Sequence, residues 1–492
     1  MILKKRRTNP FSKNQDLKKI KFLTQMPNVK FIESDKNLGL VAIDVQRYNS
    51  MTQEHLRDSE TYIKIGPVTD HQDIIMRNIQ NQLDEIIGSI LHLPPHQVKY
   101  LKYPWKYKLP CFHVLPKLHK PNDTKGRPIV GATAWMTTPA SKLLDRLLSE
   151  RPKPAHILKN SLELLKRIKN ISLNEKSYLV TMDIQSLYTN IDIPNLENLI
   201  DSHDSTCGDL CKYINKNNYF TYKNDLYFQK QGLPMGTNAA VSLANIYLEH
   251  YLDPILLRNP KISFYHRYID DLFFIYTPTS NMEEFNHLET MLNSAIPKIK
   301  LTSITNQNII NFLDLTIFKE DNKIQTRVYY KPMNRFLYLP YQSCHPVSVK
   351  KSFISGEILR YKRLNTTVFN YNIQKEIFRT YLLQRGYPKR FLDPIFKTEP
   401  MDPKATDTVQ YKQMITRHDG TNINPIKALF HQQKDSCNHL GVTIRLTFRN
   451  SPSIAKLLMT SNLNERQMKY LEDLITSTSP PTNSYLSHTT DL

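Results

Sequence analysis

The sequence predicts an α+β protein whose chemistry is carried by carboxylates in a sheet. From about residue 100 to 320, short β-rich runs alternate with helical ones, and beyond about 335 the pattern is mainly helical. Aspartates stand at the end of one apolar run and inside another, where packing alone favours none. A chain of 492 residues has room for a sizeable core and more than one domain.

Each element follows from hydrophobic periodicity and from the residues that interrupt it. The N-terminal "LVAID" predicts a strand, and "DIIMRNIQNQLDEIIGSIL" has apolar residues at helical spacing before "HLPPH" breaks the chain. "SYLVTMDI" predicts a buried strand, and "FYHRYIDDLFFIYTP" predicts a strand, a tight turn and a second strand. The expected elements are strands at 40–44 and 177–184, helices at 73–91 and 236–252, and a hairpin at 220–229.

Charge is the strongest global signal. The chain has 66 Lys and Arg against 45 Asp and Glu, a net charge of +21 and a pI of about 9.5. Residues 102–127 hold seven Lys/Arg and one acid, and residues 323–390 hold fourteen against two, both runs rich in aromatic residues. A solvated face is one reading of such a run; two aromatic-rich runs favour contact with nucleic-acid phosphates and stacking on bases or sugars.

Several function classes are disfavoured. No stretch approaches the ~18 consecutive apolar residues of a membrane helix. The basic start "MILKKRRTNPFSKNQ" has no apolar core of signal-peptide length, so we expect an intracellular protein that is not secreted. Five scattered cysteines fit free thiols; Cys207 and Cys211 follow His203, but no second pair completes a zinc site.

The run "RYIDDLFFIY" places Asp270 and Asp271 among apolar and aromatic residues. Asp183 ends the apolar strand of "LVTMDIQSLYTNI", so all three carboxylates can converge on one edge of a sheet. Arg267, at odd spacing from Asp270, falls on the opposite strand face. Carboxylates without a basic partner suggest Mg²⁺, and two such ions bracket an in-line displacement at phosphorus. The alternative is an ordinary cap at Asp183 and an exposed hairpin turn.

These residues resemble the conserved blocks of reverse transcriptases. "RYIDDLFFIY" is similar to their Y-x-D-D block, and "DIQSLYTNI" to the block that carries their other metal-binding aspartate. "QGLPMGTNAAVSLANIYLEHYL" resembles the intervening block, "LPKLHKPNDTKGRPIV" the fingers blocks, and "NFLDLTIFKEDNK" the primer-grip hairpin. All five occur in the family order over residues 115–323.

Further stretches resemble the Penelope-like retroelements, a branch related to telomerase. They include "DKNLGLVAIDVQRY", "TTPASKLLDRLL", "YYKPMNRFLYLPYQSCHP", "SGEILRYKR" and "QRGYP", and the likeness covers roughly residues 33–390. Many members of that family carry a GIY-YIG endonuclease, and no such motif occurs in this chain. We therefore expect either a lineage without the endonuclease or a truncated copy.

The resemblance implies a right-hand polymerase with a palm built on an antiparallel sheet and a helical thumb. The expected division is an N-terminal extension with a basic leader at 1–95, fingers and palm at 96–330 (the palm from 176), a thumb at 331–400, a C-terminal extension at 401–476 and a disordered tail at 477–492.

The resemblance also implies roles for single residues. Asp183 and Asp270 would hold two Mg²⁺ ions, for which Mn²⁺ substitutes, and Asp271 would assist. Lys117 and Arg127 would bind the triphosphate, although Lys117 also fits a contact with backbone phosphate. Beside them Gln231 and Gly232 would line the nucleotide pocket, the glycine allowing close backbone approach. Residues expected at the primer and template are Tyr268, Phe312, Leu313, Lys331, Arg360, Lys362 and Arg363.

In this prediction, Tyr188 selects deoxyribose over ribose in the incoming nucleotide. It lies five residues after Asp183, where reverse transcriptases place an aromatic ring under the 2′ carbon, and the alternative is an ordinary core tyrosine. Either Lys298 or Lys300 could protonate the leaving pyrophosphate, and the sequence does not decide between them.

The expected function is RNA-directed DNA polymerisation for a mobile element in the nucleus, primed from a target-site 3′-hydroxyl. Its partners would be an RNA template, a DNA primer and deoxynucleotide triphosphates, with no membrane. The alternatives are a host-retained reverse transcriptase and an inactive descendant that only binds nucleic acid; the latter predicts loss of a metal carboxylate, and all three are present.

Overall fold

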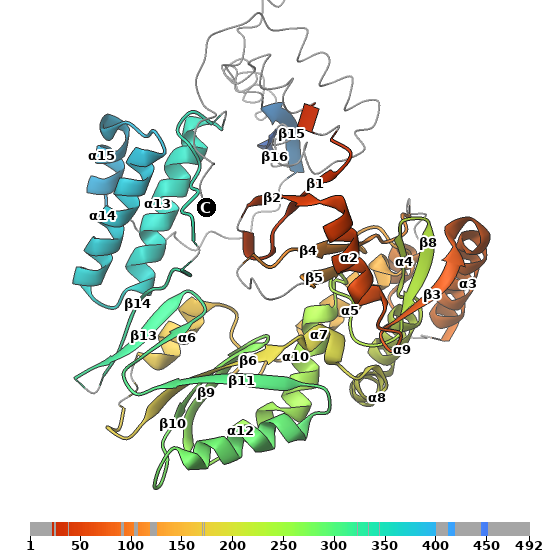
Figure 1. The fold of residues 1–492 in the computed structure, drawn as a ribbon, viewed down its shortest axis with the longest axis horizontal. Coiled ribbons are helices and arrows are strands. Elements are labelled where there is room, and N and C mark those ends of the chain that lie inside the picture. The colour runs from red at the N-terminus through yellow and green to blue at the C-terminus, as the bar shows by residue number, and fades with distance from the viewer. Residues whose placement is uncertain are drawn as a thin grey trace, which may run out of the picture. The chain divides into compact units, whose positions relative to one another are not determined.

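The computed structural model describes residues 22–23, 26–37, 39–89, 93–102, 107–118, 125–169, 171, 173–321, 323–332, 334–343, 345–399, 412–418 and 444–450. These fall into two compact units. The larger unit contains residues 49–334 and 363–374, and the other contains the described residues up to Tyr48, those of 335–362 and those from Lys375 on. Figure 1 shows the elements of both.

The larger unit is built on a four-stranded antiparallel sheet in the order β11-β6-β10-β9. Its strands are β6 (Tyr178–Gln185), β9 (Ile262–Tyr268), β10 (Asp271–Tyr276) and β11 (Lys300–Asn306). From Leu272 to Tyr276, β10 is buried throughout because both faces of the sheet are covered there. One face carries Leu272, Phe274 and Tyr276, and the other carries Phe273, which lies between the rings of Phe264 and Phe312.

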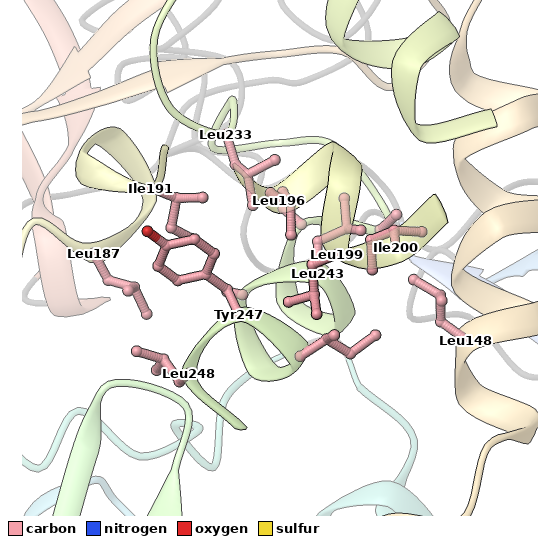
Figure 2. Packing of buried hydrophobic residues seen from close by; sticks show 14 of the residues in the cluster. Leu148, Leu187, Ile191, Leu196, Leu199, Ile200, Leu233, Leu243, Tyr247 and Leu248 are labelled. Carbon is pink, nitrogen blue, oxygen red and sulfur yellow. The ribbon is translucent and has the colours of Figure 1, made fainter. Parts of the chain in front are cut away.

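Helices cover the first of these faces. They include α5 (Thr138–Glu150), α8 (Ile193–His203), α9 (Ser205–Lys216), α10 (Ala240–Tyr251) and α12 (Glu283–Ala295), whose apolar residues join one buried cluster with the sheet. In Figure 2, Leu187, Ile191 and Leu233 lie around the ring of Tyr247 on α10. Packing of this kind fixes the segments that surround the end of β6.

Smaller elements complete the larger unit. The sheets are β3-β8-β7 (Tyr62–Pro67, Asp225–Gln229, Tyr219–Tyr222), β4-β5 (Phe112–Leu115, Arg127–Val130) and β12-β13-β14 (Ile309–Phe312, Leu315–Glu320, Lys323–Val328). The helices are α3 (Val68–Ser89), α4 (Pro95–Leu101), α6 (Ser161–Ile168), α7 (Leu187–Asn190) and α11 (Asp253–Leu257). The helix α2 (Val45–Leu56) begins in the other unit.

The second unit contains the hairpin β1-β2 (Val29–Glu33, Leu40–Asp44), with a 3₁₀ turn at Asp35–Asn37 between its strands, and most of three helices. These are α13 (Val347–Leu364), α14 (Val368–Gln384) and α15 (Lys389–Lys397); the end of α13 and the start of α14 belong to the larger unit. Tyr338, Phe353, Tyr361, Phe378 and Phe396 form an aromatic core in edge-to-face and tilted contacts.

The expected α+β class and nearly all the expected elements are present. The strand at 40–44 has the predicted bounds, and the strand at 177–184, the hairpin at 220–229 and the helix at 236–252 have slightly different ends. The helix expected at 73–91 starts earlier, at Val68, because it follows β3 directly and Val68 N donates to Asn224 O at 2.9 Å. Mainly helical structure was expected beyond 335, yet β15 (Lys412–His418) and β16 (Ile444–Asn450) form a parallel pair. The leader and the tail from 477 lie outside the described residues.

Candidate active site

Strands β6 and β10 bring the predicted carboxylates together. Asp271 is the register partner of Asp183, and the amide of Ile184 donates to the carbonyl of Asp270 at 3.2 Å. Directly opposite residues of an antiparallel pair point to the same face of a sheet, so Asp183 and Asp271 face the same side. Two like charges in that position destabilise the pair unless a cation or another charge compensates them.

Asp270 lies in the tight turn between β9 and β10. Tyr268 pairs with Asp271, which leaves Ile269 and Asp270 as the two turn residues. Ile269 has φ 54°, the positive value that two-residue hairpin turns require at their first position. A β-branched residue in this left-handed region is uncommon and strained, so the turn needs support from its surroundings.

That support comes from Arg267, whose side chain is 0% exposed. Its Nη1 donates to the carbonyl of Ile269 at 3.0 Å and to Asn245 Oδ1 of α10 at 2.7 Å. Its Nε and Nη2 donate to the two oxygens of Asp253 at 3.0 and 2.8 Å, a bidentate pair. Arg267 is the register partner of Leu272, so it lies on the sheet face opposite Asp271, and it binds Asp253. The opposite face expected from its spacing to Asp270 stays a prediction, because Asp270 lies in the turn and not in a strand.

Asp253 begins α11 and is itself 0% exposed. Its oxygens also accept the hydroxyl of Tyr265 at 2.6 Å and contact His156 Nε2 at 2.8 Å. Burial raises the pKa of the Asp253 carboxyl, but the bond to His156 and the charge of Arg267 outweigh it and hold that pKa below its ordinary value. The carboxylate is therefore charged at neutral pH and compensates the buried guanidinium.

Strand β11, the other neighbour of β6, distinguishes the two lysines that the sequence suggests as proton donors to the leaving pyrophosphate. Thr302 of β11 is the register partner of Asp183, and Lys300 lies two residues before it. Because alternate residues of a strand share a face, Lys300 points to the carboxylate side of the sheet. Lys298 lies in the preceding turn at φ 67°, with its Nζ 3.9 Å from Glu60 Oε2.

The turn at Gln231 and Gly232 rests directly on the backbone of α7. A Cβ at Gly232, where φ is 73°, would lie 2.6 Å from Tyr188 O and from Thr189 Cα, so only glycine fits. Leu233 N donates to Tyr188 O at 2.7 Å, and Gln231 Nε2 donates to Ile191 O at 3.1 Å. Gly232 therefore packs closely on the backbone at Tyr188 and Thr189, and its expected approach to a nucleotide stays a prediction.

Tyr188 links the carboxylates to the predicted nucleotide-binding cations. Its half-buried ring packs at the edge of the main core. Burial and then the negative charge of Asp270 raise the pKa of its hydroxyl to about 12, while the charge of Arg127 opposes them. The charges of Asp270 and Arg127 thus act on the same hydroxyl in opposite directions.

Arg127 starts β5 opposite Leu115 of β4, and Lys117 follows two residues after Leu115. Gly126 at φ 69° and Gly236 at φ 136° press against Leu115 O and Val130 O, which leaves no room for a side chain at either glycine. The contact at Gly236, with the bond from Val130 N to Met235 O at 3.0 Å, seats the β4-β5 hairpin on the loop that follows Gly232. Residues 119–124 of the predicted fingers block lie outside the described residues.

Of the residues predicted to contact primer and template near this hairpin, one is a core side chain and the others lie at the surface. Phe312 is only 3% exposed, with its ring centroid 5.5 Å from that of Phe273, so its side chain belongs to the core beneath the hairpin. Leu313, at φ 53°, is half-exposed in the β12-β13 turn, Tyr268 is half-exposed beside the carboxylates, and Lys331 is exposed.

The basic run at 323–390 differs from its expected role in one respect. Many of its tyrosines pack on protein: Tyr361, Tyr371 and Tyr387 are buried, and Tyr341 contacts Phe391. Buried Lys350 donates to two backbone carbonyls. Stacking on bases was expected of these rings and is wrong for the buried ones, because a helical core uses the same aromatic residues.

Other cations of this run lie at the surface. Lys362 and Arg363 are exposed and Arg360 is half-exposed. Arg360 pairs with Glu357 at 2.7 Å and Lys362 with Glu399 at 3.6 Å. Pairs of exposed ions are weak, so they leave these side chains able to exchange a carboxylate for a phosphate.

The donor set fits Mg²⁺. No three His, Cys, Asp or Glu side chains in the described part of the chain form a ready-made cage. Two facing carboxylates, with a third in the adjoining turn, suit an ion that keeps several waters and takes its remaining oxygens from substrate phosphates. Cys207 and Cys211, by contrast, are buried along α9, and burial raises the pKa of each thiol to about 12.

The amino-acid sequence supports the same assignment independently. Residues 118–307 match the family model described as reverse transcriptase (RNA-dependent DNA polymerase), a range that includes all three carboxylates. This segment is similar to a reverse transcriptase domain. The antiparallel sheet with its carboxylates is the palm of a right-hand polymerase, and the match supports an RNA-directed DNA polymerase, a nucleotidyltransferase, in this part of the chain. Residues 337–397 match a second model, the animal helix-turn-helix domain.

Among solved structures, the chain resembles telomerase from Candida albicans in complex with a fragment of telomeric RNA, at 10% identity and a TM-score of 0.47. It resembles truncated apo telomerase from Candida tropicalis at 12% identity and a TM-score of 0.39. These matches cover 75% and 60% of this chain, which spans 66% and 63% of the two telomerase chains. The BmCPV RNA-dependent RNA polymerase matches at 11% identity and a TM-score of 0.35, covering 68% of this chain and 33% of that one. No curated protein matches, and no helix in the described residues is long and apolar enough to cross a membrane.

Proposed function

We propose that the protein extends a DNA 3′-hydroxyl on an RNA template with deoxynucleotides. The observation that carries the proposal is the register of β6 and β10, which sets Asp183 opposite Asp271 with Asp270 in the adjoining turn, inside a reverse transcriptase domain. Carboxylates gathered in this way at a strand end and a hairpin turn suit the binding of divalent cations, which phosphoryl transfer requires.

The reaction joins the primer 3′-oxygen to the α-phosphorus of the nucleotide. The O–H bond of the primer hydroxyl breaks and its proton passes to water. A new P–O bond forms as the bond from the α-phosphorus to the bridging oxygen breaks, and pyrophosphate leaves with that oxygen. Two Mg²⁺ ions, for which Mn²⁺ substitutes, would supply charge neutralisation for the attacking and leaving oxygens when bound. Asp183 and Asp270 would hold them, with Asp271 assisting. Lys300, on the carboxylate face, is placed to donate the proton that pyrophosphate takes up.

The cations of the β4-β5 hairpin bind the triphosphate. Arg127 starts β5, and its charge acts on the hydroxyl of Tyr188 together with that of Asp270, which supports a role at the triphosphate. Lys117 lies just beyond the paired end of the same hairpin. The turn at Gln231 and Gly232 supports the nucleotide pocket from below through the backbone of Tyr188.

The helices from α13 to α15 act as a thumb that grips the primer–template duplex. The turn between α13 and α14 is bonded to β14, where Thr326 Oγ1 donates to Leu364 O at 2.9 Å and Thr366 N donates to Thr326 O at 3.0 Å. The match of residues 337–397 to an animal helix-turn-helix domain, a motif of DNA-binding proteins, agrees with duplex binding.

The biological setting is a mobile element of the Penelope-like type, copied in the nucleus from a target-site 3′-hydroxyl. Support comes from the resemblance over residues 33–390 and from the basic charge, which suits a chain that holds RNA and DNA at once.

The test is primer extension by the full chain on poly(rA)–oligo(dT) with Mg²⁺. Wild type should extend, and Asp183→Asn or Asp270→Asn should lose at least roughly a thousandfold in rate while binding primer–template almost normally. Near-normal extension by either variant would sink the two-metal assignment. A wild type that binds the duplex but extends it with neither Mg²⁺ nor Mn²⁺ would leave an inactive, nucleic-acid-binding descendant.

A further inference from the structure

A basic cavity lies at the outer edge of the palm sheet, beside β9. Its volume is about 370 Å³, and four cations line it: Arg151, Lys153, Lys159 and Arg167. Glu163 is the one acidic residue of the lining. It caps the start of α6, where it accepts the amide of Lys159 at 2.7 Å and Arg167 Nη2 at 2.5 Å.

The charge of this cavity is only partly compensated. Arg151 lies 4.0 Å from Glu249, and Arg167 shares Glu163, so each arginine has one acid at hand. Lys153 and Lys159 are exposed, and in the described part of the chain neither forms an ion pair. A concave site with a surplus of cations and polar walls suits the oxygens of a phosphate group.

The position of the cavity connects it to the catalytic turn. The segment that lines it adds to the edge of β9, because Arg267 N donates to His156 O and Leu158 N donates to Arg267 O, both at 2.8 Å. Three residues beyond Arg267 stands Asp270. At about 3.3 Å per residue the cavity begins ~10 Å from the carboxylates along the strand.

The helix α6, which lines the cavity, also reaches the carboxylate face of the sheet. Arg167 Nη1 lies 3.4 Å from Nε2 of His266, a residue two positions before Tyr268 and therefore on the same strand face. Tyr268 in turn pairs with Asp271. At the other end of α6, Ser161 Oγ donates to Asp314 in the turn of the predicted primer-grip hairpin. The helix that lines the cavity thus contacts both β9 and that hairpin.

We propose that this cavity binds backbone phosphates of the primer strand a few nucleotides upstream of its 3′ end. The inference rests on the proposed function, because the primer terminus is placed at the carboxylates. A distance of ~10–20 Å at 3.4 Å per nucleotide corresponds to about three to six linkages from the terminus. The primer strand is the occupant because the helix that lines the cavity contacts both β9 and the primer-grip hairpin.

The test is a binding measurement on the full chain, made by fluorescence anisotropy with an RNA-template, DNA-primer duplex and no divalent metal. The variant Lys153→Gln/Lys159→Gln removes two lining charges that hold no ion pair in the described structure. The control, Lys176→Gln/Lys216→Gln, removes two exposed charges elsewhere in the same unit. Affinity of the cavity variant should fall about tenfold near 0.1 M salt, and its log–log salt slope should drop by about one to two. The control should keep the wild-type slope.

A scan of neutral methylphosphonate linkages identifies the strand. In wild type, one or two neutral linkages about three to six positions upstream in the primer should weaken binding, and in the cavity variant the same linkages should have no effect. An unchanged salt slope in the cavity variant, or a sensitive linkage only in the template, overturns the proposal. This readout involves no extension, so it is separate from the test of polymerase activity. If the protein extends primers normally but the scan finds no sensitive linkage in the primer, the proposed function stands and the proposed phosphate site is wrong.

Discussion

The buried pair of Arg267 and Asp253 gives the largest stability effect that we expect from one isosteric substitution. In Asp253→Asn the side chain keeps its shape but loses its charge. Four donors converge on the two carboxylate oxygens, two of them from Arg267 and one each from Tyr265 and His156. An amide NH₂ group in place of one oxygen would meet donors where it needs an acceptor.

The magnitude follows from burial. Both partners are 0% exposed, so the substitution leaves an uncompensated guanidinium inside the protein. Removing one partner of a buried ion pair costs about 3–5 kcal/mol, against about 1 kcal/mol or less for an exposed pair. Lys212→Gln, which breaks the partly exposed pair with Asp201 at 3.0 Å, is the matched control.

The assay is equilibrium unfolding in urea near pH 7. Because the pKa of Asp253 is depressed, its charged form contributes stability above the ordinary value of 3.8, and that contribution is lost as pH falls further. We expect the difference between Asp253→Asn and wild type at pH 7 to persist down to about pH 4 and to shrink only as the pH falls below the ordinary value of 3.8. The midpoint should shift with little change in the m-value.

A double variant distinguishes a lost pair from a general packing defect. Asp253→Leu/Arg267→Met removes both charges, and it should be more stable than Asp253→Leu alone because no charge is left buried and unpaired. Costs that simply add, or a loss below 1 kcal/mol for Asp253→Asn, would refute the reasoning. Arg267→Met should also slow primer extension beyond its effect on binding, because the carbonyl of Ile269 loses its donor.

Three further predictions concern the polymerase itself. Tyr188→Val should raise the kcat/KM for ribonucleotides relative to deoxynucleotides on one primer–template while Tyr188→Phe keeps the wild-type ratio; an equal fall in both rates would identify the ring as packing. Lys300→Gln should alter the pH–rate profile of extension more than Lys298→Gln, because only Lys300 shares the carboxylate face, and equal effects would contradict that register. Neutralising the thumb cations together should flatten the salt dependence of duplex binding, and an unchanged slope would place the duplex elsewhere. Those cations are Arg360, Lys362 and Arg363.

The sequence was sufficient to predict the strands that carry the three carboxylates because their signal is local. A carboxylate within an apolar strand run is conspicuous in one dimension, and the two-residue turn at Ile269 and Asp270 fixes the register of β9 with β10 without other information. The pairing of Asp271 with Asp183 joins segments 88 residues apart, and it needed the order of the motif blocks as a guide.

The supporting network could not be predicted in the same way. His156, Asp253 and Arg267 are ordinary polar residues in the sequence, and only the packing of α11 against β9 makes them partners. One signal was available: an arginine on the apolar face of a strand requires a buried acid. The acid itself, at the start of "DPILL", has the appearance of a helix cap.

For the aromatic residues of α13 and α14, composition alone does not distinguish a role in the core from a role in binding nucleic acid. Runs of tyrosine and lysine have the same composition whether the rings meet bases or each other, and charge gives no help. Helical periodicity does distinguish core rings from surface residues. Tyr361, Tyr371 and Phe378 recur on the buried sides of two helices, while the exposed cations lie between them.

Two adjacent carboxylates at a strained turn account for the buried polar network beneath the β9-β10 hairpin. Asp183 and Asp271 are like charges in directly opposite positions, which is unfavourable in itself, and Ile269 adds the cost of a left-handed β-branched residue. Arg267 supports the turn from the other face, since it donates to the carbonyl of Ile269 and is itself held by the buried carboxylate of Asp253. A cation bound between Asp183 and Asp271 would reduce their repulsion. Mg²⁺ should therefore stabilise wild type against unfolding more than it stabilises Asp183→Asn, even with no nucleotide present.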